Sequence, residues 1–263
     1  MAVTASGLAV IFGLMGVINF AHGEFMMLGA FVAVWTASFD LFWLSLLLAP
    51  VLVGLGSLAI ETGLIRRLYD RPLETILATF GLSLVIREAM KFAVGPQFRS
   101  LDSPLDGSTL VLGVQYPTYR LLVLAIAASL LLALVLLLRA TRFGLLIRAV
   151  IANRDLAAGL GVNVSGVYMA AFATGSALAA FAGATLAPLV TIHPEMGPDF
   201  LVGAFLPVIL AGSSPVALAG SAGLLGGTQS LVGRYWDATA GTIALLLLAV
   251  LIMRIRPQGL ARR

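Results

Sequence analysis

The sequence predicts an all-α membrane protein, a polytopic bundle in which some of the membrane segments are short or broken. Hydrophobic residues make up 60% of the chain and charged residues only 11%, and the mean hydropathy is +1.05. These values lie far outside the usage of soluble proteins. Because each membrane helix needs roughly 20 apolar residues, the chain has room for about eight segments and little else. Residues 1–263 are therefore expected to form one transmembrane domain.

Apolar tracts separated by polar breaks locate the segments along the chain. Those of the first two thirds are residues 3–18, 25–37, 41–65, 73–94, 121–138 and 167–189. Polar breaks at 212–215 and 234–237 divide the last tract, 200–253, into three short crossings. Broken helices are tolerated at membrane depth only beside protein or an aqueous cavity, a pattern typical of transporters. The tract at 167–189 is rich in small residues and should face protein more than lipid.

Basic residues occur in three groups between the apolar tracts. These are Arg66, Arg67 and Arg71; Arg139, Arg142, Arg148 and Arg154; and Arg254, Arg256, Arg262 and Arg263. A nucleic-acid-binding patch would have another distribution, so no nucleic-acid partner is expected. Cytoplasmic loops of membrane proteins carry such an excess, and we therefore place all three groups in the cytoplasm. The polar, turn-forming loop 95–119 is then outside, and Arg87, Glu88 and Lys91 are expected to reach toward the outer interface.

Several kinds of chemistry are excluded by residue type. The chain has no cysteine, so it holds no disulfide and no thiolate metal site. A phosphate-binding loop needs a lysine after its glycines, which Gly220, Gly223, Gly226 and Gly227 lack. These glycines are instead interpreted as surfaces for close helix packing, and the chain is not itself an ATPase. No serine-hydrolase elbow is present either.

Three polar side chains interrupt the first apolar region, namely Asn19, His22 and Glu24. Such groups are costly in lipid unless they face the bundle interior or a water-filled cavity. They are therefore candidates for lining a translocation path. The alternative is a helix break whose polar groups turn to an interface, with Glu24 near the positive N-terminus of the next helix. A metal site is the weakest interpretation, because two candidate ligands without a supporting cluster are a poor signal.

The inner segment 148–161 is too polar to span a membrane and predicts one short amphipathic helix. Ala149, Leu156 and Leu160 can share a face, whereas Arg154 and Asp155 can meet water. Two glycines, at 159 and 161, supply its stop. By itself this pattern fits either a helix at the membrane surface or a docking element for a cytoplasmic partner.

Three stretches resemble permeases of the high-affinity branched-chain amino acid ABC importer family. The run at 13–24 resembles the N-terminal signature of that family, and residues 148–163 resemble its cytoplasmic coupling segment. The ending at 256–260 resembles the usual family ending, so the likeness covers nearly the whole chain. Members commonly begin earlier, so we expect a shortened first helix here. The first tract is also too short for a cleavable signal peptide.

The resemblance implies a multi-pass permease of the bacterial inner membrane, working in the lipid bilayer beside a second permease subunit, homologous or identical. Two cytoplasmic ATPase subunits would bind ATP and Mg, so this chain would need no cofactor and would not be an enzyme. A periplasmic or extracellular binding protein would deliver the solute. The residues that would contact the ATPase lie in the coupling segment and are Arg148, Asn153, Asp155, Leu156, Gly159 and Gly161.

The solute expected from the resemblance is a branched-chain or another amino acid. Family members also carry urea or short amides, which is the alternative within the same class of transporter. An alternative from another class is a stand-alone channel or secondary carrier for a small neutral solute. Flux through the isolated chain separates that class from an ATP-driven importer.

Overall fold

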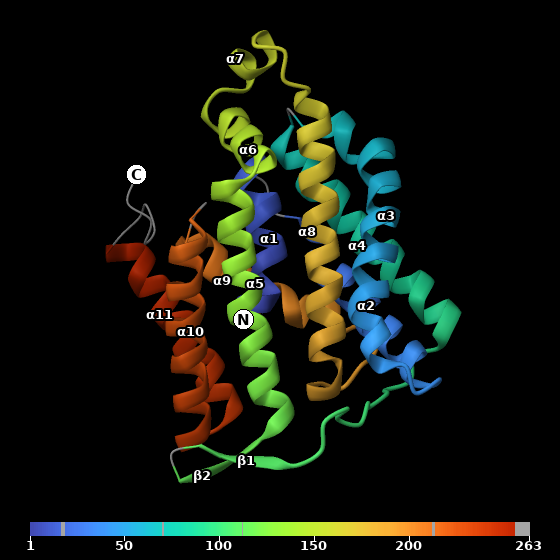
Figure 1. Cartoon of the computed structure of the whole chain (residues 1–263), viewed down its shortest axis with the longest axis vertical. Helices are drawn as coiled ribbons and strands as arrows, with labels where there is room; N and C mark the ends of the chain where they lie inside the picture. The colour runs from blue at the N-terminus through green and yellow to red at the C-terminus, as the bar shows by residue number, and fades with distance from the viewer. Residues whose placement is uncertain (17–18, 70, 112, 212–213, 256–263) are drawn as a thin grey trace.

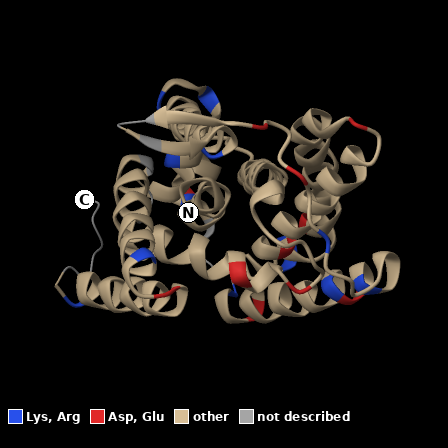
Figure 2. Cartoon of the chain, turned by 90° about the horizontal axis from the view of Figure 1, so that it is seen from below, with Lys and Arg blue, Asp and Glu red and all other residues tan. Residues whose placement is uncertain are grey.

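The computed structural model describes residues 1–16, 19–69, 71–111, 113–211 and 214–255. It confirms a helical bundle whose long helices run mostly along one axis (Figure 1). Helices α6 and α7 lie at one end of this axis and a two-stranded hairpin lies at the other. Charged residues are few on the ribbon seen along the axis in Figure 2, as a membrane protein requires.

The helices that form the bundle are α1 (Ala2–Met15), α2 (His22–Ala37), α3 (Ser45–Gly63), α4 (Pro72–Val94), α5 (Thr118–Ala140), α8 (Val164–Leu186), α9 (Gly197–Ala211), α10 (Pro215–Tyr235) and α11 (Ala238–Ile255). The connecting elements are η1 (Phe42–Leu44), η2 (Ile65–Leu68), β1 (Ser108–Val111), β2 (Val114–Pro117), α6 (Arg142–Ala152), α7 (Arg154–Gly159) and η3 (Ala187–Leu189). The final third thus has the three pieces that the sequence predicts.

Helix lengths confirm that long and short segments are mixed. Among the described residues, four helices are long and apolar enough to cross a membrane by themselves, at Phe42–Gly63, Thr118–Ala140, Val164–Leu189 and Ala238–Ile255. By contrast, α1, α2 and α9 have 14, 16 and 15 residues. At 1.5 Å per residue each covers only about 21–24 Å, less than the hydrocarbon core of about 30 Å. Short helices of this kind must end inside the bundle.

The first break is placed differently from its prediction. Gly16 adopts a left-handed conformation (φ 64°), and its N–H bonds to the carbonyl of Phe12, which ends α1 before Asn19. His22 and Glu24 then lie in the first turn of α2. Residues 17–18, the end of the predicted apolar tract 3–18, are outside the described residues.

Helix α8 lies at the centre of the packing. A methyl group on Gly183 would overlap the carbonyl oxygen of Met26 in α2, and one on Gly29 would overlap that of Ala180 in α8. Gly7 of α1 meets Gly175 of α8 in the same way. In lipid there is no hydrophobic force that drives helices together, so close van der Waals packing at small residues holds them in contact. The prediction that this small-residue helix faces protein is confirmed.

The glycine set of α10 does not pack as predicted. Among the described residues outside the local helix backbone, no atom lies within 4 Å of a methyl group placed on Gly220, Gly223 or Gly227, and Gly226 meets only the side chain of Met1. Within the described chain, close helix contact is made instead by glycines of α1, α2 and α8, and α10 meets α11 at another glycine pair, Gly233 and Gly241. Glycine spacing alone does not say which face of a helix has a neighbour.

The two ends of the bundle differ in charge and in structure. The basic groups of η2 and of α6–α7 lie at one end, where Tyr69 stacks on Tyr168 at the start of α8. Figure 1 shows α11 running toward the same end. At the opposite end, the loop predicted to be outside contains the β1–β2 hairpin, and Arg99 forms a bridge with Ile192. The sequence did not predict this hairpin.

Candidate functional site

The three polar residues singled out in the first break are all buried in the structure. Asn19, His22 and Glu24 expose 3%, 0% and 1% of their surfaces. The side-chain oxygen of Asn19 accepts a hydrogen bond from the N–H of Ala21 (3.0 Å), which fixes the turn that leads into α2. Their burial in the bundle favours the interior position over an interface position.

His22 ties the start of α2 to the start of α1. Its Nε2 lies 3.0 Å from the carbonyl oxygen of Thr4. A carbonyl oxygen only accepts, so Nε2 carries the hydrogen and Nδ1 of the neutral ring is an acceptor. Because the N-terminus lies about midway along the long axis in Figure 1, this contact places the first turn of α2 near the middle of the bundle.

Glu24 forms an ion pair with Arg87 of α4. Their Oε1 and Nη2 atoms are 3.0 Å apart, and Ser83 donates a hydrogen bond to the same oxygen (3.3 Å). The prediction that Arg87 reaches the outer interface is wrong, since its side chain turns inward and is only 19% exposed. An isolated buried carboxylate is far more costly than a paired one, which explains the inward direction.

The other two charges near the end of α4 do lie toward the outer loop. Lys91 pairs with Glu88 at 2.9 Å and with Glu195 at 2.7 Å. The Lys91 ammonium lowers the pKa of the Glu195 carboxyl, chiefly through this hydrogen bond. Both acids are largely exposed, so these pairs fasten an outer loop and contribute little stability.

The N-terminus of α9 also belongs to the site. Gly197 lies against the Glu24 carboxyl, where a methyl group would be 2.6 Å from Oε1, and a methyl group on Gly23 would overlap the Gly197 carbonyl oxygen. Two short helices therefore meet at their N-terminal ends beside one carboxylate, which the partial positive charge of such ends favours. Sequence reasoning missed Ser83, Arg87 and Gly197. A search for a cation able to balance Glu24 would have found Arg87.

Four buried atoms of this cluster have no hydrogen-bond partner among the described residues. They are Asn19 Nδ2, His22 Nδ1, Glu24 Oε2 and Arg87 Nε. Buried polar atoms are nearly always satisfied in folded proteins, so several orphans in one place need an explanation. The described residues contain no group of three His, Asp or Glu side chains that could hold a metal ion. The cluster therefore offers hydrogen-bond donors, hydrogen-bond acceptors and charges of both signs.

The segment 148–161 contains a break that the sequence prediction did not include. Asn153 is extended (φ −161°) and separates α6 from α7, and its side-chain oxygen caps α7 by accepting from the N–H of Leu156 (2.9 Å). The expected single helix is therefore two, and Ala149 lies on a different helix from Leu156. Asp155 is in the first turn of α7, and Gly161, with φ +87°, follows its end as expected.

Aromatic and charged side chains connect this segment to the bundle. The guanidinium of Arg154 lies 5.6 Å from the ring centre of Tyr168, which stacks on Tyr69 with ring centres 4.4 Å apart. The Tyr69 hydroxyl donates to the carboxylate of Glu61, a fully buried residue of α3 that also pairs with Arg66 at 3.1 Å. Burial chiefly raises the pKa of Tyr69, so its hydroxyl stays protonated and able to donate. The cytoplasmic segment thus contacts α8 and, through η2, α3.

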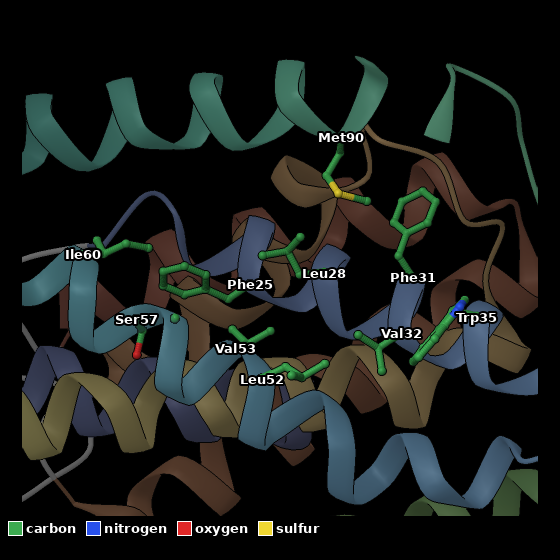
Figure 3. Close-up of a pocket in the computed structure, with 11 residues that line it drawn as sticks. Phe25, Leu28, Phe31, Val32, Trp35, Leu52, Val53, Ser57, Ile60 and Met90 are labelled. Atoms are coloured by element: carbon green, nitrogen blue, oxygen red, sulfur yellow. The ribbon is translucent and has the colours of Figure 1, made fainter. Parts of the chain in front are cut away.

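A separate cavity of about 420 Å³ lies among α2, α3 and α4 (Figure 3). Its lining is almost wholly apolar, as the side chains of Phe25, Leu28, Val53 and Met90 illustrate. A polar solute would lose its hydrogen bonds to water there without replacement. The cavity therefore does not by itself form a site for a polar solute.

Short helices that end in the bundle interior, next to buried charges, define the class of a multi-pass membrane transport protein. The family model described as "Branched-chain amino acid transport system / permease component" matches residues 1–255. The chain belongs to this family.

Curated relatives agree with the family over nearly all of this chain and most of their own lengths. The permease protein LivH of a high-affinity branched-chain amino acid transport system, from Salmonella typhimurium, is 28% identical, with 100% of this chain and 91% of the relative covered. The corresponding protein BraD of Pseudomonas aeruginosa is 27% identical with the same coverage. A probable LivH of Methanocaldococcus jannaschii is also 27% identical, covering 99% and 88%. No solved structure matches.

Membership fixes the general role of the chain. It is a permease subunit of an ABC importer, a multi-pass protein of the bacterial inner membrane and not an enzyme. ATP hydrolysis belongs to separate subunits of such a system.

Proposed function

We propose that this chain carries branched-chain amino acids, or closely similar amino acids, into the cell. The observation that carries the proposal is the buried cluster of Asn19, His22, Glu24 and Arg87, which offers hydrogen-bond donors, acceptors and both signs of charge at the meeting of two short helices. An amino acid presents the same set of groups, and the names of the relatives indicate the same cargo. The three residues predicted from the first break thus belong to the translocation path.

In this proposal the coupling segment 148–161 contacts the ATPase and moves when the ATPase changes conformation. Leu156 and Leu160 of this segment are 62% and 78% exposed although the segment lies at the basic, cytoplasmic end of the bundle. Exposed leucines in a segment that also carries the polar residues Arg148 and Asp155 suit a protein partner better than water. The bounds of α7 are set by Asn153, which caps its start, and by Gly159 and Gly161 at its end. These three residues therefore set the shape of the docking surface.

A chain of side-chain contacts connects α7 to the membrane helices, so movement of α7 can be transmitted to them. Arg154 and Tyr168 form its first step, and Tyr69 and Glu61 extend it to α3. Because α3 and α2 both pack against α8, a shift of these helices changes the surroundings of Glu24. ATP binding in the partner subunits would therefore alternate access to the buried cluster.

The complete importer contains more than this chain. In the proposal, two copies of a permease, or two homologous permeases, stand side by side and each contacts one of two ATPase subunits, which hold ATP and Mg. A solute-binding protein outside the membrane supplies the amino acid. This chain supplies the path and needs no cofactor of its own.

Uptake in cells tests the choice of solute. Cells lacking their own branched-chain amino acid uptake would express the chain together with a second permease, the ATPase subunits and the binding protein. Labelled leucine should enter, and excess valine or isoleucine should compete with it, whereas urea and acetamide should not. Competition by urea or acetamide, with none by valine, would replace the amino acid by the amide alternative.

A further inference from the structure

Every fourth residue along α4 is polar over most of its length. The series contains Thr75, Thr79, Ser83, Arg87 and Lys91. Residues at this spacing follow one ridge of a helix. We name this series the α4 polar stripe. The other side of the helix presents large apolar residues to the surroundings, namely Leu73, Leu77, Phe80, Leu84, Val85 and Phe92.

From Thr79 to Lys91 the α4 polar stripe faces the first break and the loop before α9, whereas the Thr75 hydroxyl donates to the carbonyl of Leu68 in η2. Thr79 accepts a hydrogen bond from the N–H of Phe20 (3.3 Å), and Ser83 donates to Glu24. Thr75, Thr79 and Ser83 are almost fully buried, at 5%, 1% and 4% exposure. A lipid-facing helix has no need of such a stripe, because hydroxyl groups gain nothing from a hydrocarbon neighbour. The stripe is therefore the side of α4 that meets polar groups.

We propose, building on the proposed function, that the α4 polar stripe and Glu24 form one wall of the translocation path, and that the Glu24–Arg87 pair binds the backbone of the amino acid. In the present structure the two side chains bond to each other and close the path. When they separate, Glu24 accepts hydrogen bonds from the ammonium group of the solute and Arg87 donates to its carboxylate.

The chemistry of this exchange favours a zwitterion. Separating a buried ion pair exposes two unbalanced charges, which is strongly unfavourable unless each finds a new partner. An amino acid supplies both partners at once, on one carbon atom. Urea carries neither charge, so it would leave the charges of Glu24 and Arg87 without partners. The path would therefore reject urea.

Two orphan atoms lie on the pair itself. Glu24 Oε2 and Arg87 Nε make no hydrogen bond among the described residues, although both are buried. The pair is thus held by one carboxylate oxygen and one guanidinium nitrogen, and each side chain keeps an unused atom for a second partner. A purely structural arginine–carboxylate contact would be expected to be bidentate, with both carboxylate oxygens bonded to guanidinium N–H groups.

Cysteine labelling tests whether the stripe is hydrated, since the chain has no cysteine of its own. Thr79→Cys and Ser83→Cys would be compared with Leu77→Cys and Val85→Cys, which lie on the apolar side of the same helix. The assembled importer would be treated with a membrane-impermeant, positively charged methanethiosulfonate during ATP hydrolysis. Because only a hydrated thiolate reacts, the stripe positions should react at least about tenfold faster than the controls.

Excess leucine identifies what occupies the stripe. It should slow the reaction of Ser83→Cys, and it should leave the slow controls unchanged. Equal labelling rates at all four cysteine positions would overturn the proposal that the α4 polar stripe lines the translocation path. Fast labelling that leucine does not slow would overturn the amino-acid subsite. The labelling rates themselves require no particular solute, so failure of the path is distinguished from a wrong choice of cargo.

A double variant separates binding from a structural role. Glu24→Gln and Arg87→Gln would each leave one buried charge without a partner, whereas the combination leaves none. If the pair only holds α4 in place, the combination should restore uptake to within about twofold of the unmodified importer. The proposal predicts that the combination assembles normally and that leucine uptake stays at least about tenfold lower. Restored uptake would overturn it.

Discussion

Replacing Gly183 of α8 by alanine tests the close packing that positions the site. The added methyl group would overlap the carbonyl oxygen of Met26 and would lie 2.6 Å from its carbonyl carbon and 2.9 Å from its Cα. Ordinary contacts are near 3.5–4.0 Å, so α2 and α8 must separate by about an ångström. The opposing atoms are backbone and cannot rotate away.

Gly183→Ala should lower the free energy of unfolding by about 3 kcal/mol or more, which is the upper end of the usual range for overpacking. For a chain of this size this loss corresponds to a fall of roughly 6–12 °C in the thermal unfolding midpoint. Unfolding in detergent measures the midpoint, and leucine uptake should fall as well, since Glu24 lies on the displaced helix.

Gly220→Ala is the matched control. Gly220 is also a glycine within a helix, and no described residue beyond its own helix turn lies within 4 Å of an added methyl group. Because alanine favours a helix over glycine by roughly 0.5–1 kcal/mol, this variant should be unchanged or slightly more stable. Equal midpoints for the two variants would refute the proposed packing of α2 on α8.

Three further predictions concern the cytoplasmic end. Asn153→Ala removes the cap of α7 and should cost about 1 kcal/mol locally, seen as faster amide exchange in α7 than in the unmodified protein. Asp155→Arg, or a bulky residue at Gly161, should abolish uptake while membrane insertion, measured by fractionation, stays normal; normal uptake by both would contradict the coupling assignment. Tyr69→Phe removes the hydrogen bond to Glu61, worth about 1.5–3 kcal/mol because it involves a charge. The ratio of leucine carried to ATP hydrolysed should drop, and an unchanged ratio would exclude the proposed route.

Apolar length predicted most of the bundle because lipid imposes a strict rule on it. A helix must satisfy its own backbone in hydrocarbon, so each apolar tract becomes a helix and each polar break becomes an end. The division of the last third by breaks near Pro215 and Trp236 follows from this rule. The β1–β2 hairpin does not, because it lies outside the membrane and depends on local turns.

The candidate site was predicted only in part. Burial of Asn19, His22 and Glu24 follows from the cost of polar groups in lipid. The position of Arg87 depends on which way α4 turns, and a snorkelling arginine and an inward-paired arginine have the same sequence pattern. Only the contact with Glu24 distinguishes them.

The cytoplasmic segment shows a similar limit. The apolar spacing in 148–161 fits one helix, but the side chain of Asn153 competes for the N–H groups of the next turn and starts a new helix there. Likewise, the glycines at 220, 223 and 227 of α10 look like those of α8 in sequence, but among the described residues Gly175 and Gly183 of α8 lie against another helix and the three of α10 do not. Local patterns identify surfaces able to make a contact without identifying the partner.

ATP dependence of transport by the purified importer tests the central claim most directly. The chain would be reconstituted in liposomes alone, or with its partner permease, the ATPase subunits and the binding protein, and labelled leucine inside the liposomes would be measured. We predict no flux through the chain alone, and accumulation only with all partners and ATP. Leucine flux through the chain alone, unaffected by ATP, would contradict the account and favour a channel or secondary carrier.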